Sequence, residues 1–307
     1  MRRSLWCLFM ILALFLTACS APMETAGTTE TTTPEGEGNP EPPTDSGNTG
    51  ECEHVLSDPT CTMPARCTLC KRPFGTSLGH DWKNGECTVC KREDTMARKK
   101  EGVLRVVCVG DSITRGEYWA NNFGERLSAE DYEVMGCGVN GATGLKAGLD
   151  GSVPEPRGYL ITEEYKLSLR YNPDIVVIML GTNDSKGMNA DRIREDGGEQ
   201  YKKDMIELID SYKALEADPQ IFLALPATIY RDPGTGKGIN DPALVELIIP
   251  LLLQVAEETG VILIDVHTPT QDCSALFPDG VHPSLDGKAL LAQIVSDAIL
   301  ENAETEE

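Results

Sequence analysis

Basic side chains and histidines are scarce in this sequence. Its 307 residues include 27 lysines and arginines against 49 aspartates and glutamates, so the formal net charge is −22. A protein this acidic repels polyanions, which excludes nucleic acid as an expected partner. Only 4 histidines are present, so any chemistry that needs an imidazole base has few candidates.

Long apolar runs are also lacking, except at the N-terminus. Leu5–Leu16 is apolar, follows Arg2-Arg3 and precedes Thr17-Ala18-Cys19. The run is too short for a comfortable membrane span. It resembles a bacterial lipoprotein signal with its lipobox, in which Cys19 would become the acylated first residue. We therefore expect residues 1–19 to be a signal peptide and the protein to be anchored to the outer face of the bacterial membrane. The alternative is an ordinary cleaved signal or an uncleaved anchor.

Residues 20–50 have almost no large apolar side chains and are rich in Thr, Glu, Pro and Gly. Such a segment cannot bury enough surface to offset its ordering entropy. We expect it to be a disordered, extended tether.

Cysteine, by contrast, is concentrated in residues 51–94. Two C-x2-C pairs, Cys67/Cys70 and Cys87/Cys90, each precede Lys-Arg and are separated by 16 residues. This repeated spacing predicts a zinc-ribbon-like module in which the four thiolates fill one tetrahedral shell. The other potential ligands could extend that shell or form a second one: Cys52, His54, Cys61 and His80.

Disulfides are the alternative for these cysteines, because an exported module meets oxidising conditions. The two histidines and the tight C-x2-C pairs favour a metal instead. The segment also resembles Cys/His-rich repeats in cell-surface proteins of anaerobic Gram-positive bacteria. Because a closed four-ligand shell leaves no open position for a substrate, we expect a structural or adhesive role.

Residues 95–102 form a basic connector, residues 302–307 an acidic tail, and residues 103–301 alternate regularly between apolar strands and helices. Asp174–Leu180 is almost continuously apolar, which is typical of a central parallel strand buried on both faces. The pattern predicts a doubly wound α/β sandwich. The expected strands are Leu104–Val109, Tyr132–Gly138, Asp174–Leu180, Ile221–Leu225 and Val261–Val266. The expected helices are Tyr118–Ala129, Thr162–Tyr171, Gln200–Leu215, Pro242–Thr259 and Ser284–Leu300.

Four polar blocks follow strands or precede the last helix. In open α/β sheets such positions lie at the edge where ligands bind. The blocks are Gly110–Thr114 (GDSIT), Gly138–Gly144 (GVNGATG), Gly181–Asp184 (GTND) and Asp279–His282 (DGVH).

These blocks supply the parts of a nucleophilic site. Ser112 needs a base, which His282 could provide, and Asp279 could hold that imidazole in the required tautomer. The backbone N–H groups of Ser112 and Gly141 and the side-chain amide of Asn183 are candidate donors for an oxyanion hole. Asp111 is expected to play a structural or supporting part.

The four blocks resemble the signature blocks of the SGNH, or GDSL-type, hydrolases. That resemblance implies a flavodoxin-like three-layer α/β/α sandwich with a five-stranded parallel sheet, and a triad of Ser112, His282 and Asp279. It also implies an oxyanion hole made by Ser112, Gly141 and Asn183, with Gly138 as the alternative to Gly141 because Asn140 stands where the family more often has serine. No cofactor is expected for catalysis.

The expected activity is therefore that of a serine esterase. The expected location of the protein outside the cytoplasm and the lack of an obvious apolar lid favour short acyl groups as substrates, especially O-acetyl on carbohydrate. The alternatives are a lysophospholipase or thioesterase of the same family, and a glycan-binding lipoprotein without catalysis.

Overall fold

The computed structural model describes residues 53–83, 86–94, 96, 99–115, 122–123, 126–231 and 238–303. The chain divides into two compact units, Met1–Asp94 and Thr95–Glu307. Among the described residues, none of the helices combines the length and the apolar character that a membrane span requires. Cys19, Cys52, the signal sequence and the tether lie outside the described residues.

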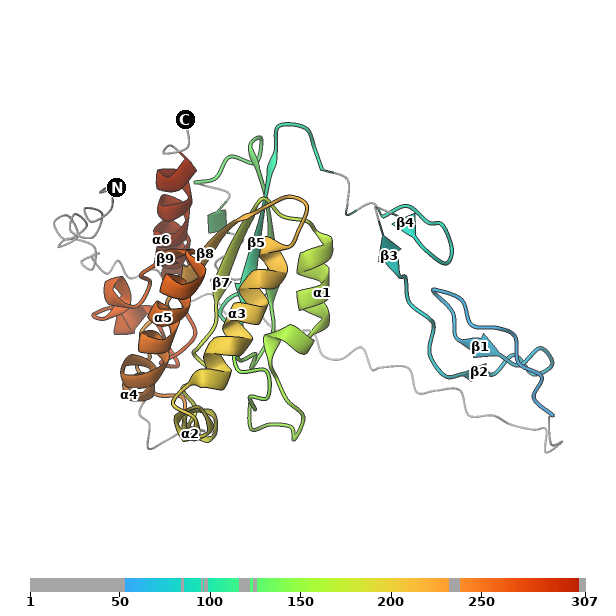
Figure 1. The fold of residues 1–307 in the computed structure, drawn as a ribbon, viewed down its shortest axis with the longest axis horizontal. Coiled ribbons are helices and arrows are strands. Elements are labelled where there is room, and N and C mark those ends of the chain that lie inside the picture. The colour runs from blue at the N-terminus through green and yellow to red at the C-terminus, as the bar shows by residue number, and fades with distance from the viewer. Residues whose placement is uncertain are drawn as a thin grey trace, which may run out of the picture. The chain divides into compact units, whose positions relative to one another are not determined.

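The second unit is built on a five-stranded parallel sheet (Figure 1). Its strand order, β6-β5-β7-β8-β9, is that of flavodoxin-like folds, in which the chain reverses its winding direction next to the first strand. The predicted α/β sandwich with a five-stranded parallel sheet is thus confirmed. The strands are β5 (Leu104–Gly110), β6 (Tyr132–Gly138), β7 (Ile175–Met179), β8 (Gln220–Ala224) and β9 (Ile262–Ile264).

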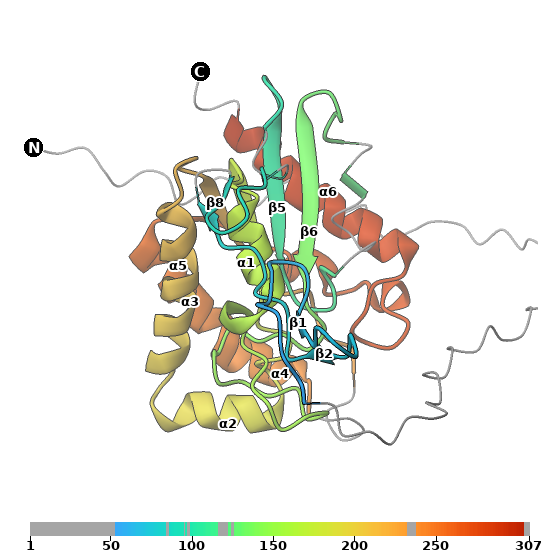
Figure 2. The ribbon, with the colours of Figure 1, turned by 90° about the vertical axis from the view of Figure 1, so that its right-hand side faces the viewer.

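Helices cover both faces of this sheet, as Figure 2 shows with α1, α3 and α5 on one side of β5 and α6 on the other. Alternate side chains of β5 enter the two cores: Val107 and Val109 face one, and Val106 and Cys108 face the other. This period of two is what a strand buried on both faces requires. The helices are α1 (Glu163–Arg170), α3 (Glu199–Lys213), α5 (Ile249–Thr259) and α6 (Leu285–Ala303).

The helix expected over Pro242–Thr259 is interrupted. It consists of α4 (Asp241–Ala243), a π-helical turn η3 (Leu244–Ile248) and α5, with Pro250 in the first turn of α5. Proline has no N–H to donate, so it disrupts the regular hydrogen bonds of an α-helix. The wider π-helical turn before Pro250 allows the chain to continue as a helix.

Other departures are smaller. A helix that was not predicted, α2 (Gly187–Glu195), precedes α3. Half of the helix expected over Tyr118–Ala129 lies outside the described residues, and residues 126–129 are not helical. Short 3₁₀ segments among the described residues include η2 (Tyr159–Ile161), η4 (Thr268–Thr270) and η5 (Ser274–Leu276).

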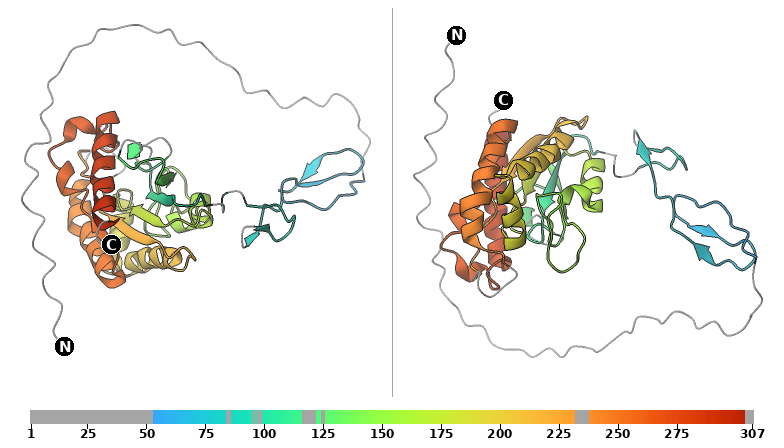
Figure 3. Two further views of the ribbon diagram at one scale, coloured as in Figure 1. Left: turned by 90° about the horizontal axis from the view of Figure 1, so that it is seen from above. Right: turned by 60° about the horizontal axis from the view of Figure 1, so that its bottom comes forward.

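The first unit contains two short antiparallel hairpins, blue and teal in Figure 3. They pair β1 (Ala65–Arg66) with β2 (Pro73–Phe74), and β3 (Trp82–Lys83) with β4 (Glu86–Cys87).

The two C-x2-C pairs lie in different clusters of this unit. One cluster joins His54 to Cys67 and Cys70, and the other consists of Cys61, His80, Cys87 and Cys90. The single shell of Cys67, Cys70, Cys87 and Cys90 expected from the spacing is therefore wrong as a grouping. The reason is geometric: the Cys67/Cys70 turn lies beside His54 and the Cys87/Cys90 turn lies beside His80. The sequence spacing alone does not determine whether the two turns meet.

Candidate active site

Ser112 lies in the tight turn that ends β5. The turn is closed by Asp111, whose carboxylate accepts the backbone N–H of Ile113 at 2.9 Å and whose carbonyl accepts that of Thr114 at 3.2 Å. A glycine is required at position 110, because a Cβ there would lie 2.2 Å from Thr114 Oγ1 and 2.7 Å from the Met179 carbonyl oxygen. This packing fixes the serine at the carboxyl edge of the sheet.

Three side chains form a hydrogen-bonded line at this edge. Ser112 Oγ lies 2.9 Å from His282 Nε2, and His282 Nδ1 lies 2.7 Å from Asp279 Oδ2. The other Asp279 oxygen accepts the backbone N–H groups of Val281 and His282 at 2.9 and 2.7 Å. The turn Asp279–His282 thus holds its own carboxylate against its own imidazole, with Nε2 directed at the serine.

The Asp279 carboxylate is held in its charged form. Partial burial alone would raise its pKa, but hydrogen bonds from the His282 side chain and from the backbone N–H groups of His282 and Val281 lower the pKa to about 2. Arg231 adds a cation 3.5 Å from Oδ2 and also donates to the Asp279 carbonyl. The imidazole therefore faces a fixed negative charge.

The candidate oxyanion donors lie in the first three blocks. In the described part of the chain, the backbone N–H groups of Ser112 and Gly141 donate no hydrogen bond. Gly141 has a φ of +75°, and a Cβ there would lie 2.8 Å from Asp150 Cβ, so only glycine fits without strain. Asn183 Nδ2 donates to the Ala142 carbonyl at 3.1 Å and lies 3.4 Å from Asp111 Oδ2. Gly138 ends β6, paired in register with Gly110.

Asp184 ties the third block to the second. Its two buried oxygens accept the backbone N–H groups of Gly144 and Leu145, both at 2.9 Å. Burial raises the pKa of Asp184 to about 6, and the Asp111 carboxylate adds to the rise; burial likewise raises the pKa of Asp111 to about 6. Burial therefore disfavours the charged forms of both Asp111 and Asp184.

Comparison with known proteins identifies the fold's relatives. A family described as GDSL-like lipase/acylhydrolase matches residues 108–290. The chain belongs to this family. The predicted membership of the SGNH or GDSL-type hydrolases is therefore confirmed.

One curated relative of this GDSL-like chain is an acetylxylan esterase of Xylanibacter ruminicola, 29% identical over 225 residues. The match covers 65% of this chain and 44% of the relative, so the chain spans less than half of that protein's length. A solved structure of an Agrobacterium tumefaciens protein assigned as an arylesterase is similar in fold. It is 24% identical, with a TM-score of 0.50, and the match covers 65% of this chain and 99% of that one.

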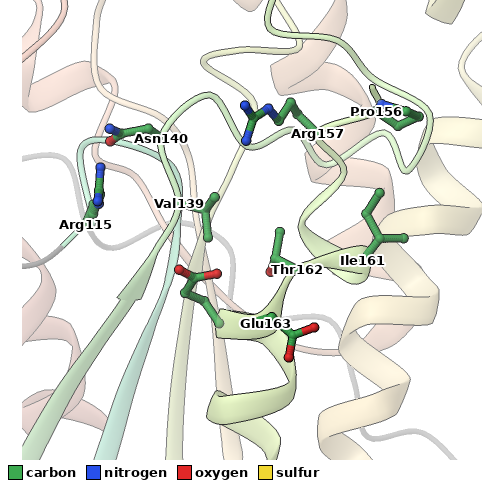
Figure 4. A pocket seen from close by; sticks show the side chains of 9 residues that line it. Arg115, Val139, Asn140, Pro156, Arg157, Ile161, Thr162 and Glu163 are labelled. Atoms are coloured by element: carbon green, nitrogen blue, oxygen red, sulfur yellow. The ribbon is translucent and has the colours of Figure 1, made fainter. Parts of the chain in front are cut away.

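A pocket of about 410 Å³ in the GDSL-like domain is lined in part by residues of the first two polar blocks and their neighbours (Figure 4). Arg115 lies three positions after Ser112, and Asn140 immediately precedes Gly141. The side chains of the pocket are mostly polar, with apolar contacts from Val139, Pro156 and Ile161. The polar lining residues are Arg115, Asn140, Arg157, Thr162, Glu163 and Glu164.

Two supporting residues of the GDSL-like site were not found from the sequence. Asp184 stands inside the GTND block, so its position was visible but its bonds to Gly144 and Leu145 were not. Arg231 follows β8 outside every block, and it meets Asp279 because the Tyr230 N–H donates to the Gly280 carbonyl at 2.8 Å. Nothing in the local sequence of Arg231 signals that contact.

The buried Asp184 carboxylate gives a pH-dependent prediction for the GDSL-like domain. Its pKa is raised from 3.8 to about 6, so between these values the folded state binds more protons than the unfolded state, and stability falls as pH rises. Asp184→Asn removes this titration. The difference in unfolding free energy between wild type and variant should therefore shrink by about 1–3 kcal/mol from pH 4 to pH 7.

Urea unfolding at the two pH values measures this difference, with Asp210→Asn on the exposed side of α3 as the control. Parallel pH curves for wild type and Asp184→Asn would contradict the assignment of a strained, buried charge at position 184.

Proposed function

We propose that this chain is an extracytoplasmic serine esterase that removes short acyl groups, chiefly O-acetyl, from carbohydrate. The observation that carries the proposal is the hydrogen-bonded line from Ser112 through His282 to Asp279. Nucleophile, base and orienting acid in one line are the arrangement that triad hydrolases use for acyl transfer.

In the proposed reaction the Ser112 oxygen attacks the ester carbonyl while His282 Nε2 takes the serine proton. Asp279 keeps the proton on Nδ1 and stabilises the imidazolium that forms. The backbone N–H groups of Ser112 and Gly141, together with the Asn183 amide, would stabilise the tetrahedral oxyanion.

His282 then protonates the leaving alcohol, and an acyl-enzyme remains on Ser112. Water attacks this ester with His282 again as the base, which releases the acid and restores the serine. The residues of the line supply the nucleophile and the proton transfers themselves, so the proposed steps route no chemistry through a cofactor.

The choice of an acetylated carbohydrate has two supports. The curated relative is described as an acetylxylan esterase. The pocket that Arg115 and Asn140 line has polar side chains from three segments, which suit a hydroxyl-rich alcohol better than a long acyl chain. The sequence of residues 1–19 supports export and a lipid anchor on Cys19, which would place the enzyme where extracellular polysaccharide is available.

A chain-length series tests this proposal. We expect kcat/KM for p-nitrophenyl esters to be highest for acetate and to fall by roughly tenfold or more by octanoate, because the polar pocket offers a longer chain little apolar surface. Acetic acid release from acetylated xylan, measured against the same xylan after chemical deacetylation, tests the alcohol part. A rate that rises steadily with acyl length would favour a lysophospholipase or thioesterase and overturn the acetyl proposal.

A further inference from the structure

The N-terminal module lacks the apolar interior that normally holds a domain together. Among its described residues, the buried hydrophobic ones are the cysteines Cys61, Cys67 and Cys87. Six of its large apolar side chains are exposed: Val55, Leu56, Met63, Leu69, Leu78 and Val89. Strands of two residues each add few backbone hydrogen bonds. A unit of this size without a core needs cross-links or a metal to remain folded.

One cluster has the dimensions of a zinc shell. The ligand atoms of Cys61, His80, Cys87 and Cys90 all lie within 4.8 Å of one another. Cys61 Sγ and Cys87 Sγ are 3.7 Å apart, and Cys90 Sγ is 3.3 Å from His80 Nδ1. For a tetrahedral zinc ion with ordinary bond lengths, two sulfurs lie about 3.8 Å apart, and a sulfur and an imidazole nitrogen about 3.6 Å.

The two C-x2-C turns also share the same backbone conformation. In both turns the residue after the second cysteine, Lys71 or Lys91, has a positive φ near 60° and donates its N–H to the carbonyl of the first cysteine. The N–H of Cys70 is directed at Cys67 Sγ at 3.4 Å. The same strained conformation at a non-glycine residue in both repeats indicates a constrained loop rather than a chance turn.

Cys61 comes from the first repeat, residues 54–70, whereas the other three ligands come from the second repeat, residues 80–90. It lies in the turn that precedes β1, and the Leu78 N–H donates to the Thr60 carbonyl at 2.9 Å, which holds this turn against the segment leading to His80. The cluster therefore takes one ligand from the first repeat and three from the second.

We propose that Cys61, His80, Cys87 and Cys90 bind one structural zinc ion, and that Cys61 thereby fastens the two repeats together. Three thiolates and one imidazole are a donor set that suits zinc in a closed tetrahedral site. The second cluster, His54 with Cys67 and Cys70, is a separate site with three described ligands. Each repeat thus has its own metal-binding cluster, and the crossing cysteine distinguishes this arrangement from a single four-cysteine shell.

Disulfides explain the cluster less well. A disulfide needs two sulfurs about 2 Å apart and has no use for a histidine. Here an imidazole nitrogen faces a cysteine sulfur in each cluster, at 3.3 Å for His80 and at 3.5 Å for His54.

The test measures metal per chain in the full-length protein by inductively coupled plasma mass spectrometry. Cys61→Ala and His80→Ala should each lower bound zinc by about one equivalent, since three ligands hold zinc far more weakly than a closed shell. Cys273→Ala, which removes a cysteine of the esterase domain, should leave the zinc content unchanged. After cobalt substitution, the thiolate charge-transfer absorption should likewise fall in Cys61→Ala and His80→Ala and stay unchanged in Cys273→Ala.

Two results would overturn the proposal. Zinc content that is unaffected by Cys61→Ala but lost in Cys70→Ala together with Cys90→Ala would support the single four-cysteine shell. Recovery of a Cys61–Cys87 disulfide peptide from protein alkylated under denaturing, chelating conditions would replace the metal by a covalent link. The hydrolysis rate of p-nitrophenyl acetate shows in each case that the esterase domain has remained folded.

Discussion

Replacing Ser112 with alanine is expected to lower kcat/KM for p-nitrophenyl acetate by about 10⁴- to 10⁶-fold, the range that removal of a serine nucleophile produces in triad hydrolases. The Ser112 oxygen lies 2.9 Å from His282 Nε2, and alanine has no hydroxyl group that this base could deprotonate. The side chain is only partly buried, so its removal should leave the fold intact. A fluorophosphonate probe should label Ser112 in the wild type and fail to label the variant.

Ser211→Ala is the matched control for this experiment. It also removes one hydroxyl, which in the wild type donates to the Leu208 carbonyl within α3. Its activity should stay within about twofold of wild type, because surface changes away from a site rarely matter. Ser112→Ala protein that keeps a tenth of the activity, or wild-type protein labelled at another serine, would rule against Ser112 as the nucleophile.

Asp279→Asn should cost about 10³- to 10⁴-fold in kcat with little change in fold. An asparagine at this position can keep its carbonyl oxygen on the backbone N–H groups of Val281 and His282. Its NH₂ group then faces His282 Nδ1, so the imidazole proton moves to Nε2 and points at the serine hydroxyl that it should deprotonate. The loss therefore arises from the wrong tautomer and not from lost binding, and KM should change little.

Asp210→Asn, on an exposed part of α3, is the matched control for the acid-to-amide change. The pKa of Asp279 is lowered to about 2, so its charged form contributes stability that is present above pH 4 and is lost as pH falls toward 2. Thermal unfolding of wild type and Asp279→Asn should converge over that interval. Activity that survives Asp279→Asn unchanged would assign the orienting role to another group.

The central strands and the four blocks could be predicted because both are recorded locally in the sequence. β7 is buried on both faces and therefore appears as an uninterrupted apolar run, within one residue at each end of the predicted Asp174–Leu180. The short helix α2 was missed because its start has no capping side chain and little apolar patterning. Its position is fixed from outside, by Asn189, which accepts the Leu149 N–H and donates to the Asn183 carbonyl.

Contacts between distant segments account for the other failures. The expected cysteine clusters were grouped wrongly because Cys87 lies beside Cys61 in space, and the repeat spacing does not encode that pairing. The contact of Arg231 with Asp279 depends on how the chain after β8 docks against Gly280, where a Cβ would lie 2.8 Å from the Arg231 nitrogen. Such close approaches are properties of the packed fold and leave no mark in either segment alone.

The hydrogen bond between Ser112 and His282 joins residues 170 positions apart. The strands that hold the serine are therefore complete in the chain long before the turn that carries its base has been synthesised. Contacts with such large sequence separation form slowly, because closing a long stretch of chain costs entropy before the contact can stabilise it. A nascent or truncated polypeptide that ends before Asp279 would carry the serine without its base, so the proposed activity would arise only after the Asp279–His282 turn has docked beside β5.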